Sequence, residues 1–259
     1  MSVLPYKNSI YISPERKVSL SRKIFPSFWF YCQVFLIVAR SAEKAKRGTY
    51  DGVEWASSSQ DILRAIEDIG VRVEITGIEH ISGNNGPAVI IGNHMSMMET
   101  LLLPGIIQPE MDVTFVIKES LLRYPIFKHV MQARNPIAVG RTNPRQDLKV
   151  VMTEGMDRLG RGISVIVFPQ TTRSHTFDPG QMSSIGVKLA RRAGVAVVPL
   201  ALKTDGWKNG NIVKDLGKID TTMKARFSFG KPMEISGKGS EEQQAVNDFI
   251  VAKLQEWEE

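Results

Sequence analysis

The stretch IIGNHMSMMETLLLPG, residues 90 to 105, has the form of a buried strand that turns directly into a helix. An apolar run ends at Gly92, the polar pair Asn93 and His94 follows, and Glu99 comes five positions after the histidine. Apolar runs that alternate with helical segments are typical of an α/β fold, in which helices cover both faces of a mainly parallel sheet. The stretch therefore predicts a fold and a place in it where polar side chains gather.

The rest of the chain repeats this alternation of strand and helix patterns. Apolar or alternating runs predict strands over residues 71–77, 87–93, 113–118, 136–141, 163–169, 195–202 and 224–230. Helical spacing predicts helices over residues 53–70, 96–106, 120–131, 145–159, 182–193 and 241–257. We therefore expect an α/β domain over residues 51–259, which follows a boundary at residues 48–52.

The composition favours a folded protein with anionic partners. Its residues are 42% hydrophobic and 23% charged, which supplies apolar material for a large core. The formal charge of +6 favours phosphorylated small molecules, anionic lipid surfaces or nucleic acid, and charge alone does not choose among them. Cys32 is the single cysteine, which excludes an intrachain disulfide and favours a reducing, cytosolic environment.

The N-terminal segment, residues 1–50, differs from an ordinary soluble sequence. The run KIFPSFWFYCQVFLIVAR, residues 23–40, joins aromatic residues to an aliphatic stretch between basic ends. Its apolar part falls short of the roughly 20 residues that a spanning helix needs. Aromatic rings beside cations suit a helix in the lipid headgroup zone, so residues 23–47 predict association with the cytoplasmic face of a membrane. The alternative is a buried helix of the fold.

The strand pattern also predicts where a functional site would lie. Ligands of a parallel sheet gather beyond the carboxyl ends of its strands. His94, Lys118 and Arg141 each follow an apolar run, and a polar segment ending in Arg173 follows a fourth. A histidine with an acid and three cations suits a base that acts on a hydroxyl next to a phosphate. Taken singly, each cation could equally be solvated, and residues 170–174, QTTRS, could be a polar turn.

His94 and Glu99 form the candidate catalytic pair. A carboxylate bonded to one ring nitrogen would fix the histidine tautomer and leave the other nitrogen free to accept a proton. The alternative is a histidine that caps a turn, with Glu99 at a helix N-terminus that Ser96 could cap. The sequence shows no metal-ligand spacing and no glycine-rich phosphate loop, so no metal or cofactor is expected. The basic stretch GRTNPRQDLK, residues 140–149, lacks interleaved aromatics, so nucleic acid is not expected either.

Four blocks in order resemble the glycerolipid acyltransferase family, the 1-acylglycerol-3-phosphate (lysophosphatidate) acyltransferases. NHMSMME at residues 93–99 is similar to the family's N-H-x-x-x-x-D, and PIAVGRTN at residues 136–143 is similar to its second block. FPQTTRS at residues 168–174 resembles F-P-E-G-T-R-S, and AGVAVVPLAL at residues 193–202 resembles the fourth block. The resemblance spans about residues 60 to 202.

The resemblance implies transfer of a fatty acyl group, without a metal or cofactor, to the hydroxyl of a glycerol phosphate or lysophospholipid. The donor would be acyl-CoA or acyl-carrier protein. His94 would be the general base, and Glu99 would orient it and support the imidazolium. The resemblance further implies a substrate-binding set consisting of Lys118, Arg141, Gln170, Thr171, Thr172 and Arg173.

Two departures from the family pattern bear on this function. Glu99 stands where the family usually has aspartate, and it keeps the carboxylate. Gln170 and Thr171 replace Glu-Gly, which removes a charge and puts a β-branched residue at a glycine position. One alternative to an active membrane-surface acyltransferase is therefore a non-catalytic lipid-binding relative with an altered acceptor site. Another is a soluble phosphate-ester enzyme, in which the N-terminal segment would not associate with a membrane.

Overall fold

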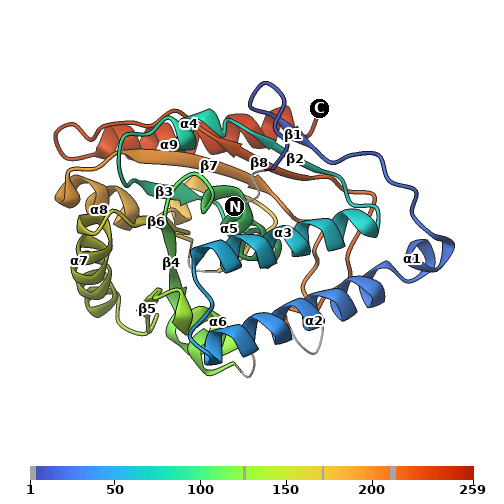
Figure 1. Ribbon diagram of the computed structural model, residues 1–259. Coiled ribbons are helices and arrows are strands. Elements are labelled where there is room, and N and C mark those ends of the chain that lie inside the picture. The colour runs from blue at the N-terminus through green and yellow to red at the C-terminus, as the bar shows by residue number, and fades with distance from the viewer. Residues whose placement is uncertain (1–3, 125–126, 171, 211–213) are drawn as a thin grey trace.

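A single mixed sheet forms the centre of the molecule (Figure 1). The computed structural model describes residues 4–124, 127–170, 172–210 and 214–259. In these ranges eight strands pair in the order β1-β2-β8-β7-β3-β6-β4-β5. Their bounds are β1 Tyr11–Ile12, β2 Val73–Thr76, β3 Val89–Gly92, β4 Val113–Lys118, β5 Ile137–Val139, β6 Ser164–Val167, β7 Val197–Lys203 and β8 Ala225–Phe229.

Most of the sheet is parallel, as the sequence predicted. β7, β3, β6, β4 and β5 are neighbours that run the same way, with Ile90 in register with Ile166 and Val198. β8 is antiparallel to β7, and β1, which the sequence did not predict, is antiparallel to β2. The carboxyl ends of five strands therefore meet at one edge of the sheet.

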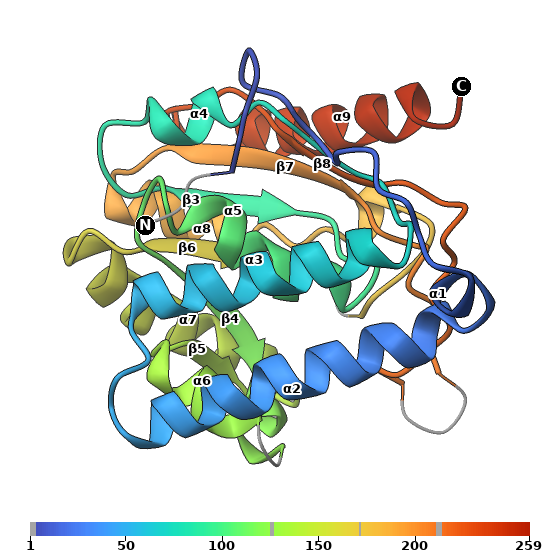
Figure 2. The ribbon, with the colours of Figure 1, turned by 45° about the vertical axis from the view of Figure 1, so that its right-hand side comes forward.

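Helices cover both faces of the sheet (Figure 2). Ile90 packs into one core with α2, α3 and α5, whereas its neighbours Val89 and Ile91 pack into a second core with α7, α8 and α9. Successive strand residues point to opposite faces, so a run that is apolar throughout needs two cores. The helices are α1 Leu20–Ile24, α2 Pro26–Lys46, α3 Gly52–Asp68, α4 Glu79–Ser82, α5 Met98–Ile107, α6 Phe127–Ala133, α7 Pro144–Gly160, α8 Ile185–Ala193 and α9 Ser240–Glu256, with 3-10 turns η1 Glu119–Arg123 and η2 Pro179–Gln181. The α/β fold with helices around a mainly parallel sheet is confirmed.

The predicted helix boundaries differ from the structure by one to three residues at most ends, and α8 begins at Ile185 instead of residue 182. The helix expected over residues 120–131 is divided into η1 and α6, and residues 125–126 between them lie outside the described ranges. α5 begins at Met98, and Ser96 is not its N-cap residue. The Ser96 hydroxyl accepts a hydrogen bond from the Met98 N–H, and it also donates a hydrogen bond to the carboxylate of Glu99 in the first turn of α5.

α2 has one buried face and one exposed apolar face. Phe30, Val34 and Val38 are buried in the core that α3 and α5 share, whereas Phe28 and Phe35 are exposed. Spacings of four residues place the buried set on one side of the helix, and a spacing of seven places Phe28 and Phe35 together on the other. No helix in the described ranges combines the length and hydrophobicity needed to cross a bilayer. The apolar run of the sequence is therefore divided between the core and the surface.

Phe30→Ala tests whether α2 is part of the folded core. The Phe30 side chain is fully buried, so its removal should lower the free energy of unfolding by about 3–5 kcal/mol. Phe35→Ala, on the exposed face of the same helix, should change it by about 0.5 kcal/mol or less, because Phe35 is 59% exposed. Urea unfolding measures both. Equal effects of the two substitutions would contradict the packing of α2.

Candidate active site

The side chain of Asn93 fixes the turn after β3, because its amide makes the two hydrogen bonds that the backbone of a neighbouring strand would make. The Asn93 side chain donates to the Leu202 carbonyl and accepts from the Leu202 N–H, both at 2.8 Å. Asn93 is buried, and a side chain at Gly92 would lie 3.1 Å from the Leu200 carbonyl oxygen. The end of β3 is therefore held against β7, and the next residue, His94, leaves the sheet at a defined place.

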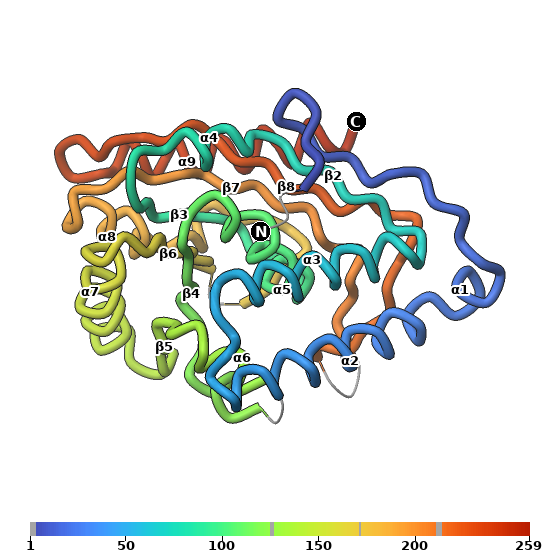
Figure 3. The backbone as a smooth tube through the Cα atoms, in the orientation of Figure 1, coloured from blue at the N-terminus to red at the C-terminus, as the bar shows by residue number. Residues whose placement is uncertain are grey.

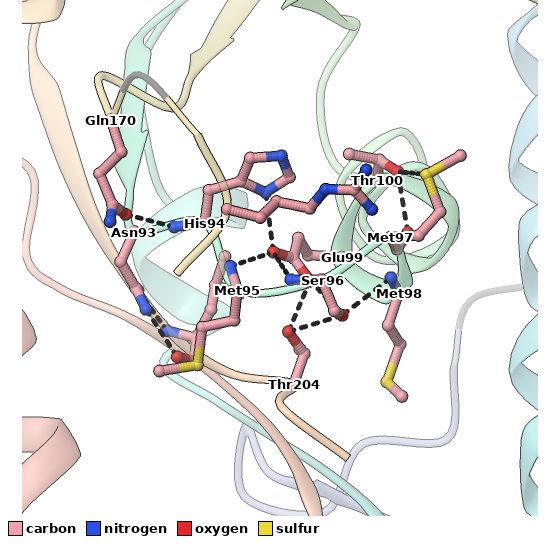
Figure 4. A network of polar contacts seen from close by, with 12 residues as sticks. Asn93, His94, Met95, Ser96, Met97, Met98, Glu99, Thr100, Gln170 and Thr204 are labelled. Atoms are coloured by element: carbon pink, nitrogen blue, oxygen red, sulfur yellow. Dashed lines mark hydrogen bonds and ion pairs between the residues drawn. The ribbon is translucent and has the colours of Figure 1, made fainter. Parts of the chain in front are cut away.

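His94 is oriented by Glu99 (Figure 4). Its Nδ1 lies 2.8 Å from Glu99 Oε1, and since an ionised carboxylate can only accept, Nδ1 carries the proton. The neutral ring then has Nε2 as a proton acceptor. The His94 side chain is 14% exposed, so the ring sits in the protein surface with limited access to solvent. This is the arrangement that the sequence predicted for a catalytic base.

The Glu99 carboxylate is fully buried and receives five hydrogen bonds. Oε1 accepts from His94 and from the N–H groups of Met95 and Ser96 at 2.7 and 2.9 Å. Oε2 accepts from the hydroxyls of Ser96 and Thr204 at 2.9 and 2.5 Å. Burial by itself raises the pKa of Glu99, but the hydrogen bonds from His94, Thr204 and Ser96, together with the positive charge that His94 carries when it is protonated, outweigh it and lower the pKa below its ordinary value.

The segment after β6 holds His94 from the other side. The Phe168 ring stacks on the imidazole, with 4.6 Å between centroids and 6° between planes. The Gln170 Oε1 accepts from the His94 N–H at 2.6 Å, and the Ser174 N–H donates to the His94 carbonyl at 2.9 Å. Both backbone polar groups of His94 are thus bonded to this segment. Gln170 departs from the family pattern, but it holds the His94 N–H through a single accepting oxygen.

Two predicted cations follow neighbouring strands. Lys118 ends β4 in register with Val139 of β5, so it lies at the same sheet edge as Arg141. Arg141 has a positive φ of 60°, and the carboxylate of Asp147 accepts from its N–H at 2.9 Å. Burial lowers the pKa of Arg141, Asp147 opposes this change, and the nearby positive charge of Arg173 lowers the pKa further. The positive charges of Arg141 and Arg173 therefore repel each other.

Arg173 and Thr172 contact a segment that the sequence did not connect with the site. Arg173 forms an ion pair with Asp215, and the Lys214 ammonium lies 3.4 Å from the Thr172 hydroxyl. Thr171, predicted to shape the pocket, lies outside the described residues.

Several contributors to the site were not identified from the sequence. Thr204 follows β7 at the same sheet edge as His94, so the rule that found the other residues would have selected it too. Asn93, Phe168 and Ser174 stand in the quoted blocks, but their contacts depend on chain segments that meet only in the fold. Within the described ranges, no group of three or more His, Cys, Asp or Glu side chains could hold a metal ion.

A sequence profile of the Acyltransferase family matches residues 72–203, which is half of the chain. The chain belongs to the Acyltransferase family. All the predicted site residues, from His94 to Arg173, lie inside the matched Acyltransferase region.

Two relatives of this chain are both named as 1-acyl-sn-glycerol-3-phosphate acyltransferases. The chain is 32% identical over 171 residues to a 1-acyl-sn-glycerol-3-phosphate acyltransferase of Pseudomonas aeruginosa, covering 66% of this chain and 62% of that one. It is 30% identical over 137 residues to the chloroplastic 1-acyl-sn-glycerol-3-phosphate acyltransferase LPAT1 of Arabidopsis thaliana, covering 52% and 37%. The chain thus spans less than two thirds of the length of either relative.

A solved Acyltransferase structure has the same fold. The crystal structure of the 1-acyl-sn-glycerophosphate (LPA) acyltransferase PlsC from Thermotoga maritima superimposes with a TM-score of 0.66 at 19% identity. The alignment covers 91% of this chain and 96% of that one.

Glu99→Gln tests the buried carboxylate. Because the folded-state pKa of Glu99 lies below its ordinary value of 4.5, the charge stabilises the fold above that pH, and this contribution is lost as the pH falls through the folded pKa. At neutral pH the variant should lose about 3 kcal/mol of unfolding free energy, and its difference from wild type should shrink in acid. Urea unfolding from neutral to acidic pH measures this. A difference that does not change with pH would contradict the depressed pKa.

Proposed function

We propose that this protein transfers a fatty acyl group from acyl-CoA or acyl-carrier protein to the hydroxyl of lysophosphatidate or a related glycerol phosphate or lysophospholipid. The observation that carries the proposal is the contact between His94 Nδ1 and the buried Glu99 carboxylate, which directs the basic Nε2 away from its acid partner. Family membership and the names of the relatives support the same reaction.

In the proposed reaction His94 acts first as a base and then as an acid. Nε2 takes the proton of the acceptor hydroxyl as its oxygen attacks the thioester carbonyl carbon. The C–O bond forms, the tetrahedral intermediate collapses, the C–S bond breaks, and the imidazolium returns its proton to the leaving thiolate. Glu99 stabilises the imidazolium and holds the ring in place, since its five hydrogen bonds leave it little freedom.

The cations at the sheet edge suit the acceptor phosphate. The positive charge of Arg173 lowers the pKa of Arg141, and a phosphate bound between the two guanidinium groups would relieve that repulsion. Lys118, at the end of the neighbouring strand, would add a further positive charge. An acceptor bound there would present its hydroxyl to the edge of the sheet where His94 lies.

The contact made by Gln170 favours an active enzyme over a non-catalytic lipid-binding relative. Its amide oxygen accepts the His94 N–H at 2.6 Å, a bond that a carboxylate oxygen at this position could equally make. The change from Glu to Gln therefore preserves the support of His94.

The exposed face of α2 suits attachment to a membrane surface. The exposed apolar side chains Phe25, Phe28, Phe35 and Leu36 repeat at helical spacing, with Ile24 of α1 beside them. Such a row would enter the acyl boundary of a bilayer while the buried face stays on the protein. Attachment to the cytoplasmic leaflet would bring the protein to a lipid acceptor, and the anionic surface there would attract its positive charge.

Only part of the basic charge in and next to residues 23–47 is available to lipid phosphate. Three basic residues there form ion pairs with protein carboxylates, Arg22 with Asp68, Lys44 with Glu54 and Arg47 with Glu43. Membrane attachment would therefore depend more on the apolar row than on these charges.

His94→Ala should lower the rate of transfer of a labelled acyl group to lysophosphatidate by about 1,000-fold, because it removes the general base. Gln170→Glu keeps the accepting oxygen and should retain most of the activity, whereas Gln170→Ala should lose most of it. Thin-layer chromatography of the labelled lipid measures each rate, and urea unfolding checks that each variant folds. Full activity of His94→Ala would contradict the proposal, and a wild-type protein that binds lipid but transfers nothing would favour the non-catalytic alternative.

Phe28→Ser with Phe35→Ser tests the membrane surface. Loss of two phenyl groups from the bilayer boundary should weaken binding to vesicles with anionic lipid by more than about tenfold, since each buried Phe contributes about 1.5–3 kcal/mol. Ile12→Ser is the control, because Ile12 is similarly exposed but lies on β1. Vesicle co-sedimentation measures binding. Equal binding of the double variant and wild type would show that this face of α2 does not carry the attachment.

A further inference from the structure

The connection between β7 and β8, residues 204–224, joins parts of the molecule that are distant in sequence. It begins at Thr204, whose hydroxyl donates to Glu99. Further along, Asp215 forms the ion pair with Arg173. Figure 3 shows this connection, in orange, running from the sheet to the side of α2. One segment therefore contacts the catalytic pair, the predicted phosphate site and the proposed membrane helix.

The ion pair between Arg173 and Asp215 is mostly buried. Their side chains are 16% and 17% exposed, so their attraction is screened less than that of a surface pair. Asp215 Oδ1 contacts the Nη2 of Arg173. A guanidinium has five N–H donors in a fixed plane, so one contact sets its orientation and leaves donors for a ligand. Asp215 can thus orient the Arg173 guanidinium while other N–H donors of that group remain able to bind a ligand.

Asp215 is held in turn by α2. The Trp207 indole packs edge-on against Phe30, with 5.1 Å between ring centroids, and its N–H donates to the Asp215 carbonyl at 3.2 Å. The Tyr31 hydroxyl donates to the carbonyl of Gly217 at 2.5 Å. Two adjacent α2 residues therefore support the backbone at Asp215 and just beyond it, Phe30 through its ring contact with Trp207 and Tyr31 through its hydrogen bond to Gly217.

We propose that Asp215 is a positioning residue of the acceptor site, which fixes the Arg173 guanidinium for the acceptor phosphate and is itself held in place by α2. The inference rests on the proposed acyl transfer. It adds that the helix proposed to lie on the membrane also sets the geometry of the site that receives the lipid headgroup. Asp215 lies beyond residues 72–203, the region that the Acyltransferase profile matches.

Asp215→Asn tests the positioning role. The variant keeps the shape of the side chain but weakens its hold on Arg173, so the KM for lysophosphatidate should rise about tenfold, as expected for one charge-assisted hydrogen bond. The kcat and the KM for the acyl donor should change little, and Asp215→Glu should restore part of the loss. Asp220→Asn is the matched control in the same connection, because its carboxylate accepts from Thr222 instead. Steady-state kinetics with each substrate varied in turn separate these effects.

Two outcomes of this experiment would overturn the proposal. A lower KM for lysophosphatidate in Asp215→Asn would mean that Asp215 competes with the phosphate for Arg173. A loss of kcat and of donor binding, together with a lower unfolding midpoint, would mean that Asp215 serves the fold in general.

Tyr31→Phe tests the link to α2, since it removes only the hydroxyl that bonds to Gly217. The KM for lysophosphatidate should rise about threefold, as expected for one neutral hydrogen bond. If α2 acts through Asp215, the double variant with Asp215→Asn should be no worse than Asp215→Asn alone. Effects that multiply in the double variant would overturn the link.

The wild-type protein separates failure of this inference from failure of the proposed function. If wild type transfers acyl groups and Asp215→Asn has unchanged kinetics, only the positioning role of Asp215 is wrong. If wild type transfers nothing to lysophosphatidate or to a panel of other acceptors, the proposed function fails, and the inference that rests on it fails too.

Discussion

The buried carboxylate of Glu99 is the constraint on which the candidate site depends. A charge with no exposure to solvent is tolerated only when its oxygens are fully bonded, and here five donors surround it. The donors come from the turn after β3 and from Thr204 after β7. The hydrogen bonds to Glu99 therefore fix the ends of β3 and β7, beside which the His94 imidazole lies. The same bonds that stabilise the fold orient the base, so a change in this acid should affect both.

Much of the fold could be predicted because the central strands are apolar throughout. Such runs belong to a parallel sheet with a core on each face, and the pairing of Ile90 with Ile166 and Val198 has this form. The rule that ligands gather at carboxyl strand ends then selected His94, Lys118 and Arg141 together. Each of these residues was identified by its place after a strand and not by its own type.

The rest depends on contacts between distant segments, which no local pattern records. No pattern in the sequence identifies Asp215, because its partner Arg173 is 42 positions away. The two residues meet only because the chain passes through β7 and then turns back in the long connection to β8. Residues 23–40 show the same limit, because aromatic and aliphatic residues are spread around the whole helix. Their division into a buried and an exposed face is decided by packing against distant segments, among them Trp207, which contacts Phe30 from far along the chain.

The substitution of Gln for Glu at position 170 has a consequence that follows from donor and acceptor chemistry. The His94 N–H requires one accepting oxygen, and amide and carboxylate both supply it. They differ in the second atom, where glutamate offers another acceptor with negative charge and glutamine offers an N–H donor. A carboxylate there would repel an anion bound between Arg141 and Arg173, whereas an amide would not. The substitution therefore leaves the support of His94 intact and removes a negative charge from the segment that also carries Arg173.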